Sequence, residues 1–348
     1  MERKREAESD RLDQMKQLRI ERYMPPRAAE WDEFVASARN STFLLYRGFM
    51  DYHSDRFEDH SLMVWDKNRL IALLPANMTT EDDGTRILHS HSGLTYGGWI
   101  VGERHPEAGE MLEIFRLLRE YCRDLNISGL DYKPIPFIYS PMPAQEDLYA
   151  LFREGAELTQ RNISVAINFR DNPGFNSQQK RNLKRAMNVE AIIRPEIKMA
   201  ADDYSEVDRR NMVAEFHRLL TECLSERHGV RPVHTEEELA LLVGRFPEKI
   251  KIVMIYSEGR VEAGVCLFDC GNVIHAQYIC STERGRRDGL LTRLFDYLID
   301  PALFPKASYF DFGICNEAGG YVLNEGLYHQ KSGLGGSGVA YDRYMLRF

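Results

Sequence analysis

A strand–loop–helix–strand pattern between Val273 and Gly313 constrains the fold more strongly than any other stretch of the chain. The apolar run Val273–Cys280 is followed by a charged loop over 281–288 and by a predicted helix over 289–300. A second apolar run, Ala307–Gly313, follows at once. A crossover of this length joins two parallel strands and places the loop at their carboxyl ends. A helix N-terminus at that edge exposes unpaired N–H groups, so we predict an anion-binding site there.

The first half of the chain repeats this order of elements. Each half begins its sheet with a predicted hairpin around a short polar turn. The matching segments are 61–74 with 252–266, the Ile87 region with 273–280, 110–125 with 289–300, and 130–132 with 310–312. The offset of ~180–190 residues is the size of a domain rather than of a solenoid repeat. We therefore predict an α/β (α+β) fold of two tandem domains, each a mixed, mostly antiparallel sheet flanked by helices.

The boundaries of these domains follow from local composition. Residues 1–22 are nearly all charged or polar and predict a solvated N-terminal tail. The N-terminal domain is placed over 23–172 and the C-terminal domain over 173–348. A basic helix over 177–188 lies between the repeats, and Ser177 is its predicted N-cap.

Composition limits the classes of function. Of the 348 residues, 43% are hydrophobic and 28% are charged, which is typical of a soluble globular protein. No apolar run reaches the ~18 residues of a membrane span, and the first residues lack the apolar segment of a secretory signal. The six cysteines show no Cys-x-x-Cys pattern, which favours reduced thiols and a cytoplasmic location. A net charge of −8 disfavours general nucleic-acid binding but permits a local basic groove.

Two motifs in the second half resemble known acyltransferases. Arg286-Arg-Asp-Gly-Leu-Leu291 resembles the donor-binding pattern of the GNAT acyltransferases, with leucine at its last position where glycine or alanine is usual. The segments Tyr309–Gly313, Asn324–Lys331 and Gly335-Gly336 resemble the C-terminal signature of the FemAB-like branch of that superfamily. The order and spacing of both motifs are more specific than either motif alone. The resemblance implies tandem GNAT-like domains, of which the second keeps the site.

The resemblance also implies a donor site around the first of these motifs. Acetyl-CoA or another acyl-CoA would bind there, with backbone N–H groups and arginines holding its diphosphate. The predicted donor-binding residues are Cys280, Ser281, Arg286, Arg287, Gly289 and Leu290. Leu291 leaves the identity of the donor open. The alternative interpretation is a charged surface loop before an ordinary helix.

The second motif implies the catalytic residues. Lys331 matches a lysine of the FemAB-like signature and would place a cation near the reacting carbonyl, where negative charge develops during acyl transfer. Tyr328 and Asp311 are predicted to act with it. The alternative interpretation of Lys331 is a surface lysine at the end of a strand. The possible bases Glu283, Asp288 and Glu325 are not ranked by the sequence.

The predicted basic helix carries a further candidate binding face. Arg181, Lys184 and Arg185 share one side of it, because residues three and four apart are neighbours on a helix. This side is predicted to bind the phosphates of a nucleotide-linked acceptor or of tRNA. The alternative interpretation is a solvated helix that links the repeats.

Metal and thiol chemistry are not predicted. His89 and His91 would share one face of a strand, but no third ligand follows at the spacing of a metal site, so packing or hydrogen bonding is favoured. Cys280 at a strand end has no basic partner in the sequence, so a buried thiol is favoured over a nucleophile.

These observations predict a cytoplasmic N-acyltransferase that needs no metal. The acyl group, expected to be acetyl from acetyl-CoA, would pass to a small-molecule or nucleotide-linked amine by direct attack in a ternary complex. A first alternative is an aminoacyl-tRNA-dependent peptidyltransferase of the Fem type, although the long coiled-coil arm common in Fem ligases has no counterpart here. A second alternative is a non-catalytic binding protein with the GNAT fold.

Overall fold

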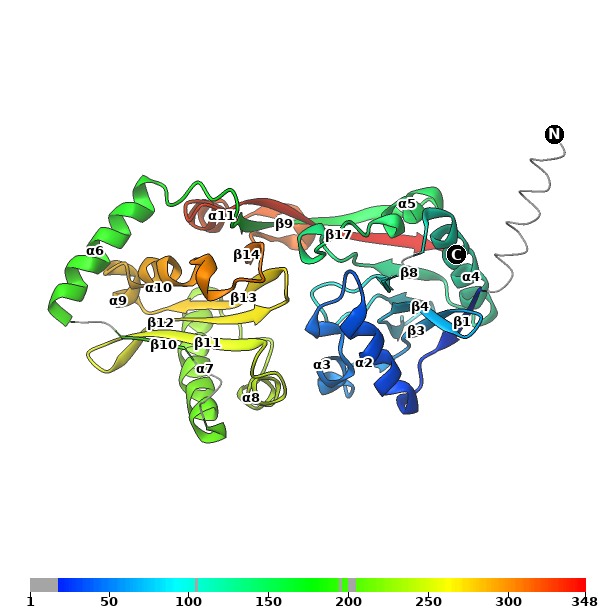
Figure 1. Ribbon diagram of the computed structural model, residues 1–348, viewed down its shortest axis with the longest axis horizontal. Coiled ribbons are helices and arrows are strands. Elements are labelled where there is room, and N and C mark those ends of the chain that lie inside the picture. The colour runs from blue at the N-terminus through cyan, green and yellow to red at the C-terminus, as the bar shows by residue number, and fades with distance from the viewer. Residues whose placement is uncertain (1–17, 104–105, 194–195, 200–204) are drawn as a thin grey trace. The chain divides into compact units, whose positions relative to one another are not determined.

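The computed structural model describes residues 18–103, 106–193, 196–199 and 205–348. The chain divides into two compact units, Met1–Arg161 with Ala340–Phe348 (unit 1) and Asn162–Val339 (unit 2). Strands β9 (Glu157–Asn168) and β17 (Ser337–Arg347) contribute residues to both units. Most neighbouring strands are antiparallel, and helices flank the sheets (Figure 1). The predicted fold class, a mixed α/β protein with mostly antiparallel sheets, is confirmed.

Unit 1 packs two groups of strands and two of its helices around one apolar core. One group has the order β1-β3-β4-β7, and the other has the order β17-β8-β6-β5-β2. Its helices are α2 (Ala28–Ser37), α3 (Arg47–Met50), α4 (Ala108–Asp124) and α5 (Glu146–Arg153). Its strands, besides β9 and β17, are β1 (Leu18–Arg22), β2 (Glu58–Asp59), β3 (Leu62–Asp66), β4 (Arg69–Leu74), β5 (Asn77–Thr80), β6 (Arg86–His89), β7 (Ile100–Val101) and β8 (Gly129–Tyr132).

Part of the expected N-terminal tail belongs to this unit. Residues 18–22, predicted to be solvated, form strand β1 and pair antiparallel with β3. Leu18 is buried and Ile20 packs against the core, while charged residues alternate with them. The tail prediction failed here because a period of two among charged residues still supports an edge strand. Residues 1–17 of the predicted tail lie outside the described residues.

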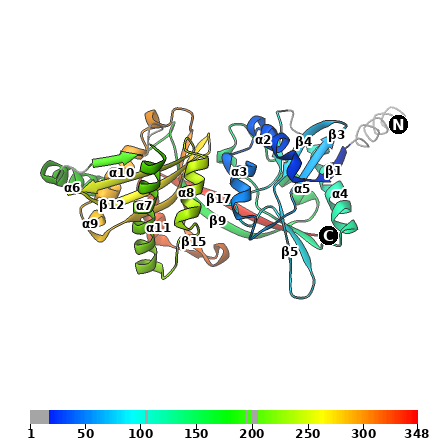
Figure 2. The same cartoon turned by 90° about the horizontal axis from the view of Figure 1, so that it is seen from below.

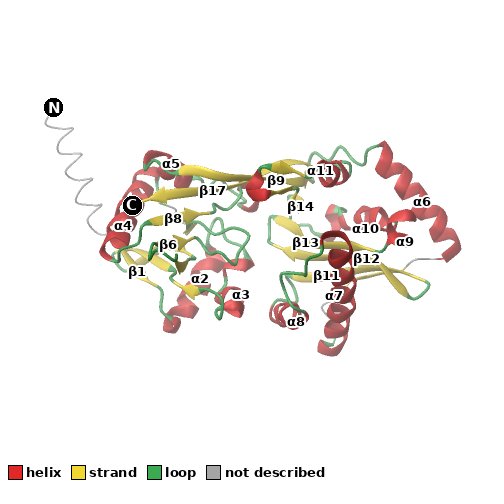
Figure 3. Ribbon diagram, turned by 180° about the vertical axis from the view of Figure 1, so that it is seen from behind, coloured by secondary structure: helices red, strands yellow, loops and turns green. Residues whose placement is uncertain are grey.

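Unit 2 contains a sheet with helices on both faces. Its strands run in the order β10-β11-β12-β13-β14-β9, and only β13 and β14 are parallel. Helix α10 lies on one face, and α7 and α8 lie on the other (Figure 3). In the view from below, α7 and α8 lie in front of the sheet (Figure 2). The strands are β10 (Glu196–Met199), β11 (Ile250–Ser257), β12 (Arg260–Asp269), β13 (Val273–Ser281), β14 (Tyr309–Ile314), and the short pair β15 (Asn316–Glu317) and β16 (Val322–Leu323). The helices are α6 (Ser177–Ile193), α7 (Glu206–His228), α8 (Glu236–Arg245), α9 (Glu283–Arg287), α10 (Leu290–Leu298) and α11 (Glu325–Ser332).

Strand β14 is fixed in the sheet by two phenylalanines. Phe310 and Phe312 are buried and contact Phe295 of α10 edge-on, with ring centroids 6.2 and 5.2 Å from it. Edge-on aromatic pairs add about 0.5–1.5 kcal/mol each to the stabilisation from burial. Because side chains alternate along a strand, Asp311 between them points to the opposite face, away from α10. An apolar anchor thus places a carboxylate on the face of α7 and α8.

Candidate active site

Strands β13 and β14 are parallel, as the crossover pattern predicts, but they pair over a short distance. The ladder begins at Val273 and Tyr309 and ends at the pair His275 and Asp311. Strand β13 continues to Ser281 beyond this pair. The two strands therefore separate after His275 and Asp311, and we call this point the fork.

A β-bulge on β13 follows directly after the fork. Ala276 lies opposite Leu267 and Tyr278 lies opposite Cys266, so Gln277 is an extra residue on its strand. A bulge re-aims backbone groups and side chains, and bulges are common beside active sites. The fork is thus a place where the backbone of β13 departs from regular pairing on both of its sides.

His275 and Asp311 form a hydrogen-bonded pair at the fork. The imidazole Nδ1 donates to the carboxylate Oδ2 of Asp311 over 2.8 Å. The Asp311 side chain is 0% exposed, and the His275 side chain is 12% exposed. The second carboxylate oxygen accepts hydrogen bonds from the Ser164 hydroxyl and from the Gly313 backbone N–H. These donors hold the ionised carboxylate in one orientation, and the carboxylate in turn orients the imidazole.

Lys331 is brought to the same place from helix α11. Its side chain is buried, with 7% exposure, and its ammonium donates to the carbonyl oxygens of Gly313 and Ile314 at 2.9 Å each. Burial lowers the pKa of this ammonium. A Cβ on Gly313 would lie 3.6 Å from Cε1 of His275 and 3.9 Å from Nζ of Lys331. The alternative of a surface lysine is therefore wrong, and Lys331 and Asp311 lie around one glycine.

Tyr328 also lies on α11, a helix that the sequence pattern does not predict. The helix begins because the side chain of Asn324 accepts a hydrogen bond from the Leu327 N–H at 3.0 Å. Tyr328 is half-buried against the core of unit 2, and its hydroxyl would lie 3.6 Å from a Cβ on Gly338. Its catalytic role stays a prediction.

The expected donor loop is largely helical. The Thr282 hydroxyl caps α9 by accepting from the Gly285 N–H at 2.9 Å. The Arg286 N–H donates to the Thr282 carbonyl, and the Gly289 N–H donates to the Arg286 carbonyl. The backbone N–H groups at these positions are therefore used within the loop itself. The charged stretch 281–288 was expected to be a loop, and the threonine cap explains why it forms a helix.

Helix α6 covers the N-terminus of α10. Gly289 has a φ of 79°, and a Cβ on it would lie 2.2 Å from the carbonyl oxygen of Asn182. The Thr292 hydroxyl donates to Oε1 of Gln179 at 2.9 Å, and Leu290 is fully buried. The glycine of the donor motif thus admits the backbone of α6. Binding of the CoA diphosphate at this helix end stays a prediction.

The other predicted donor residues lie near the end of β13. Burial raises the pKa of the Cys280 thiol well above its ordinary value, and the thiol donates to the Gly264 carbonyl. Ser281 is buried, and its carbonyl accepts from the Arg286 guanidinium. Arg287 is exposed. A buried thiol of raised pKa is a poor nucleophile, in line with the sequence interpretation of Cys280.

The basic face of α6 lies in unit 2, where it continues onto the donor loop. Arg181, Lys184 and Arg185 are exposed, while Ala186 on the other side of the helix is buried. The Arg185 guanidinium donates to the Arg287 carbonyl at 2.7 Å. The predicted acceptor-binding face and the exposed arginine of the donor loop are therefore adjacent. Their binding roles stay predictions.

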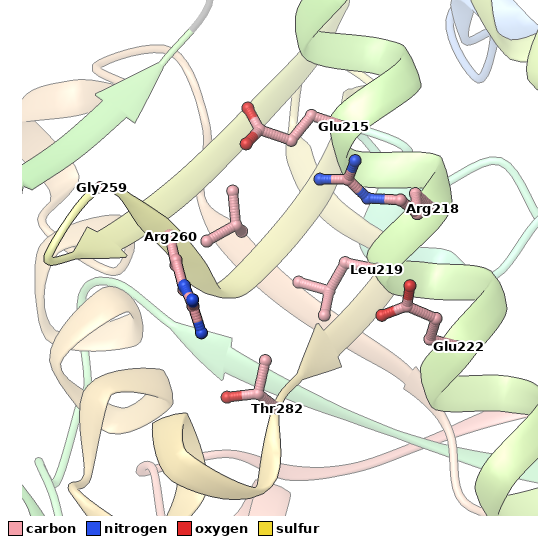
Figure 4. A pocket seen from close by; sticks show the side chains of 8 residues that line it. Glu215, Arg218, Leu219, Glu222, Gly259, Arg260 and Thr282 are labelled. Atoms are coloured by element: carbon pink, nitrogen blue, oxygen red, sulfur yellow. The ribbon is translucent and has the colours of Figure 1, made fainter.

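A pocket of about 310 Å³ opens between α7 and the β11–β12 turn (Figure 4). Charged side chains of both signs surround it, with Arg218 and Glu222 on α7 and Arg260 after the turn. Thr282, which follows the last residue of β13, forms part of the wall. His275 lies near the first residue of the same strand. The pocket and the fork are thus at opposite ends of β13.

The histidines of unit 1 do not form the expected common face. His89 ends β6, while His91 lies beyond the strand with a φ of 62°. His89 bonds to Asp131, and His91 stacks on His53 with ring centroids 5.1 Å apart. Among the residues that the structure describes, no group of three His, Cys, Asp or Glu side chains could hold a metal ion.

Comparison with known proteins bears on this region. Residues 177–321 match the family model of the acetyltransferase (GNAT) domain. The chain therefore carries a GNAT domain in its second half, and the predicted enzyme class, a GNAT-family N-acyltransferase, is confirmed. The match covers the fork, the donor loop and α6, but it ends before Lys331. A search of curated protein sequences finds no match.

Solved structures share the fold along nearly the whole chain. The crystal structure of FemX has a TM-score of 0.67 at 12% identity and covers 94% of this chain and 97% of its own. The C-terminal domain of a putative lysylphosphatidylglycerol synthetase from Agrobacterium fabrum has a TM-score of 0.57 at 10% identity, with 92% of each chain covered. A tandem GNAT protein from the clavulanic acid biosynthesis pathway has a TM-score of 0.50 at 11% identity, covering 95% of this chain and 98% of its own. At these identities the likeness establishes the fold alone.

Two residues of the fork were not among the predicted site residues. They are His275, which lies within the predicted strand over 273–280, and Ser164. The signal that could have found the pair is positional, because a histidine precedes the crossover and an aspartate ends it in both halves.

As a separate finding, none of the described helices is long and apolar enough to cross a bilayer.

Proposed function

We propose that this protein transfers an acyl group to an amine, and that the group arrives as an aminoacyl ester of tRNA rather than as acetyl-CoA. Acyl transfer in general rests on the GNAT domain match at residues 177–321. The choice of donor rests on the resemblance of the C-terminal segment to FemAB-like proteins, and the likeness of fold to FemX is consistent with it.

The hydrogen bonds within the donor loop support the same choice of donor. A diphosphate at a helix N-terminus needs free backbone N–H groups and access to them. Here the N–H groups of Gly285, Arg286 and Gly289 are used within the loop, and Asn182 and Gln179 of α6 cover the helix end. Acetyl-CoA, the donor expected first, would have to displace α6. An aminoacyl ester has no diphosphate and needs no such site.

The exposed basic face supports a polyanionic carrier. Arg181, Lys184 and Arg185 project from α6, and Arg287 lies beside them through the Arg185 hydrogen bond. A local group of cations on a chain of net charge −8 is the kind of surface that binds a phosphate backbone. We propose that this face holds the phosphates of the donor RNA while the ester reaches the fork.

The acceptor is proposed to be an amine, either a small molecule or one linked to a nucleotide. The six cysteines are buried free thiols, and we propose the cytoplasm as the location because aminoacyl-tRNA and reduced thiols are both found there. No metal enters the proposal, and activity is expected to survive chelator treatment.

The test offers both donors to the full-length protein. Bulk aminoacyl-tRNA or acetyl-CoA is mixed with methylamine or hydroxylamine, two small acceptor probes, and the amide or hydroxamate product is measured by mass spectrometry. We expect protein-dependent product from aminoacyl-tRNA and none from acetyl-CoA. Product from acetyl-CoA that is lost in Arg286→Ala/Arg287→Ala would show that the donor loop opens for CoA. Absence of product from both donors would instead favour a binding protein.

The basic face is tested by its salt dependence. Each cation that no longer neutralises a phosphate lowers the slope of log affinity against log salt by about 0.7–0.9. Arg181→Ala/Lys184→Ala is therefore expected to weaken tRNA binding and to flatten the slope by about one to two. Lys306→Ala, which removes an exposed lysine elsewhere in unit 2, is the matched control. Equal slopes in both variants would remove α6 from the RNA site.

A further inference from the structure

We propose that His275 is the base that takes the proton from the attacking amine, and that Asp311 orients it and stabilises its charged form. This assignment rests on the proposed function, because it needs an amine that becomes an amide. It goes further than that function by naming the proton acceptor and the place of the reaction, the fork between β13 and β14. Neither the donor motif nor the signature around Lys331 includes His275.

The backbone places the two side chains together. His275 and Asp311 are register partners at the last pair of a parallel ladder. Side chains of directly paired residues on one face are close neighbours, so their contact follows from the strand register. Phe310 and Phe312 anchor β14 on the other face of the sheet. The pair is therefore built on two strands of the core and not on mobile loops, which suits a group that must be held accurately.

The direction of the hydrogen bond sets the chemistry of the imidazole. Asp311 accepts from Nδ1, so in neutral His275 the proton is on Nδ1 and the lone pair is on Nε2. When Nε2 takes a proton, the ring becomes a cation in contact with a buried carboxylate. That carboxylate is held ready by the Ser164 hydroxyl and the Gly313 N–H, so little reorganisation is needed as the charge forms.

The proposed step balances in atoms and protons. The amine nitrogen attacks the carbonyl carbon of the ester, and a carbon–nitrogen bond forms. One proton of the nitrogen passes to Nε2 of His275. The bond between the carbonyl carbon and the ribose oxygen then breaks, and the departing oxygen takes the proton from Nε2 of protonated His275, so that an amide and a free hydroxyl result. His275 returns to its neutral form in the same cycle.

The surroundings of the fork suit such a step. The Lys331 ammonium and Cε1 of His275 both lie near Gly313, and the ammonium donates to the carbonyl groups at the end of β14. The bulge at Gln277 turns the backbone of β13 just beyond the histidine. The proposed proton acceptor and a buried cation thus both lie at the fork, and the bulge that follows changes the direction of the strand.

The decisive comparison uses equivalent histidines of the two units. His275→Gln removes the base, and His89→Gln makes the same change at the matching position of unit 1. General base catalysis is worth about 10²–10⁴-fold, so we expect a loss of this size in kcat with methylamine for His275→Gln. The KM for the donor should not change, because the base acts after donor binding. We expect His89→Gln to stay within about twofold of the parent.

A second acceptor separates a base from a structural residue. Both acceptors must lose one proton from nitrogen, but the nitrogen of hydroxylamine is much less basic than that of methylamine and gives up its proton more readily when the base is missing. His275→Gln should therefore lose much less activity with hydroxylamine than with methylamine. Asp311→Asn, which preserves the shape of the side chain, should show the same preference and confirms the result if His275→Gln folds poorly.

The outcomes separate the two proposals. A parent protein without product from either donor would overturn the proposed function and this assignment with it. An active parent whose His275→Gln variant retains activity, or loses it equally with both acceptors, would leave the function standing and remove His275 as the base.

Discussion

Each unit carries a histidine–aspartate pair at the same position of its sheet, but the two pairs have different neighbours. In unit 1, His89 on β6 and Asp131 on β8 are register partners at the end of a parallel ladder, as His275 and Asp311 are on β13 and β14. The hydrogen bonds between ring and carboxylate measure 2.7 Å in unit 1 and 2.8 Å in unit 2. The backbone thus repeats the pair faithfully.

The two pairs differ in the strand that lies beside the aspartate, which is β17 in unit 1 and β9 in unit 2. Asp131 lies opposite Met345 of β17, and Arg343, two residues earlier, donates to its two carboxylate oxygens from Nε and from one terminal nitrogen. In unit 2, Asp311 lies opposite Ala166 of β9, and the residue two positions earlier is Ser164. One pair is therefore neutralised by a cation, while the other is held by a hydroxyl.

The arginine changes what the histidine of unit 1 can do. Nε2 of His89 accepts from the Thr79 hydroxyl at 2.7 Å, so both ring nitrogens are engaged. Burial alone would raise the pKa of Asp131, but hydrogen bonds from Arg343 and His89 lower it to about 2. A carboxylate already balanced by arginine gains less from a protonated imidazole. We therefore propose that the pair in unit 1 is structural and that the pair in unit 2 is reactive.

A lysine lies near each pair, but the two lysines come from different parts of the fold. Lys133 follows Asp131 by two residues, and its counterpart after Asp311 is Gly313. In unit 1 the ammonium of Lys133 donates to the Leu94 carbonyl at 2.5 Å. In unit 2 the glycine leaves space that the ammonium of Lys331 approaches from α11. Both units therefore keep a lysine near the pair, but in unit 2 a separate helix delivers it.

After His275→Gln, the largest effect on this comparison is expected from Lys331→Met. The change removes the buried charge and its bonds to the Gly313 and Ile314 carbonyls while keeping the length of the side chain. We expect kcat to fall by ~10²-fold with little change in the KM for the donor, as for the loss of one preorganised cation. Lys331→Arg, which keeps the charge, should recover part of the loss. A variant Lys331→Met with normal kcat at saturating substrates would contradict a role at the fork.

An effect on stability alone is expected from Arg343→Met in unit 1. Leaving a buried charge unpaired usually costs about 3–5 kcal/mol, but Arg343 is partly exposed, so we expect about 2 kcal/mol. The pKa of Asp131 is lowered in the folded state, so the ionised carboxylate contributes stability above its unfolded pKa of about 4. This contribution disappears as the pH falls from about 4 to about 2.

The measurement for this variant is urea unfolding of the parent and Arg343→Met at pH 6 and at pH 3. The difference between the two proteins should shrink at the lower pH, while acyl transfer at neutral pH remains as in the parent. A constant difference would mean that the arginine stabilises the unit by packing rather than through the carboxylate.

Much of the fold could be predicted from the sequence because local patterns determine it. The hairpins at 61–74 and 252–266 and the crossover at 273–313 follow from apolar periodicity and turn residues, and the structure contains all three. Asp311 and Lys331 were identified through a resemblance, and the structure places both around Gly313. Strand β1 was missed because its pattern is dominated by charge.

The environment of the donor loop could not be predicted in the same way. Gly289 looks like a glycine that admits a phosphate, but the nearest backbone is that of Asn182, more than a hundred residues earlier. Whether a glycine makes room for a ligand or for a helix depends on tertiary packing, which a local motif does not report. His275 is similar, because its partner becomes visible only once the strand register is known.

The smallest effect is expected from Ser164→Ala, which tests whether the hydroxyl in place of arginine matters. The Ser164 hydroxyl donates to the buried carboxylate of Asp311, and its loss leaves the Gly313 N–H on that oxygen. One such hydrogen bond is worth about 1 kcal/mol, so we expect kcat to fall by roughly threefold to tenfold. Ser90→Ala removes an equally buried hydroxyl from unit 1 and should lower stability to a similar extent without changing kcat. If both variants slow the reaction equally, the effect is one of general stability. If only Ser164→Ala slows it, the neighbour of the aspartate determines which of the two pairs is reactive.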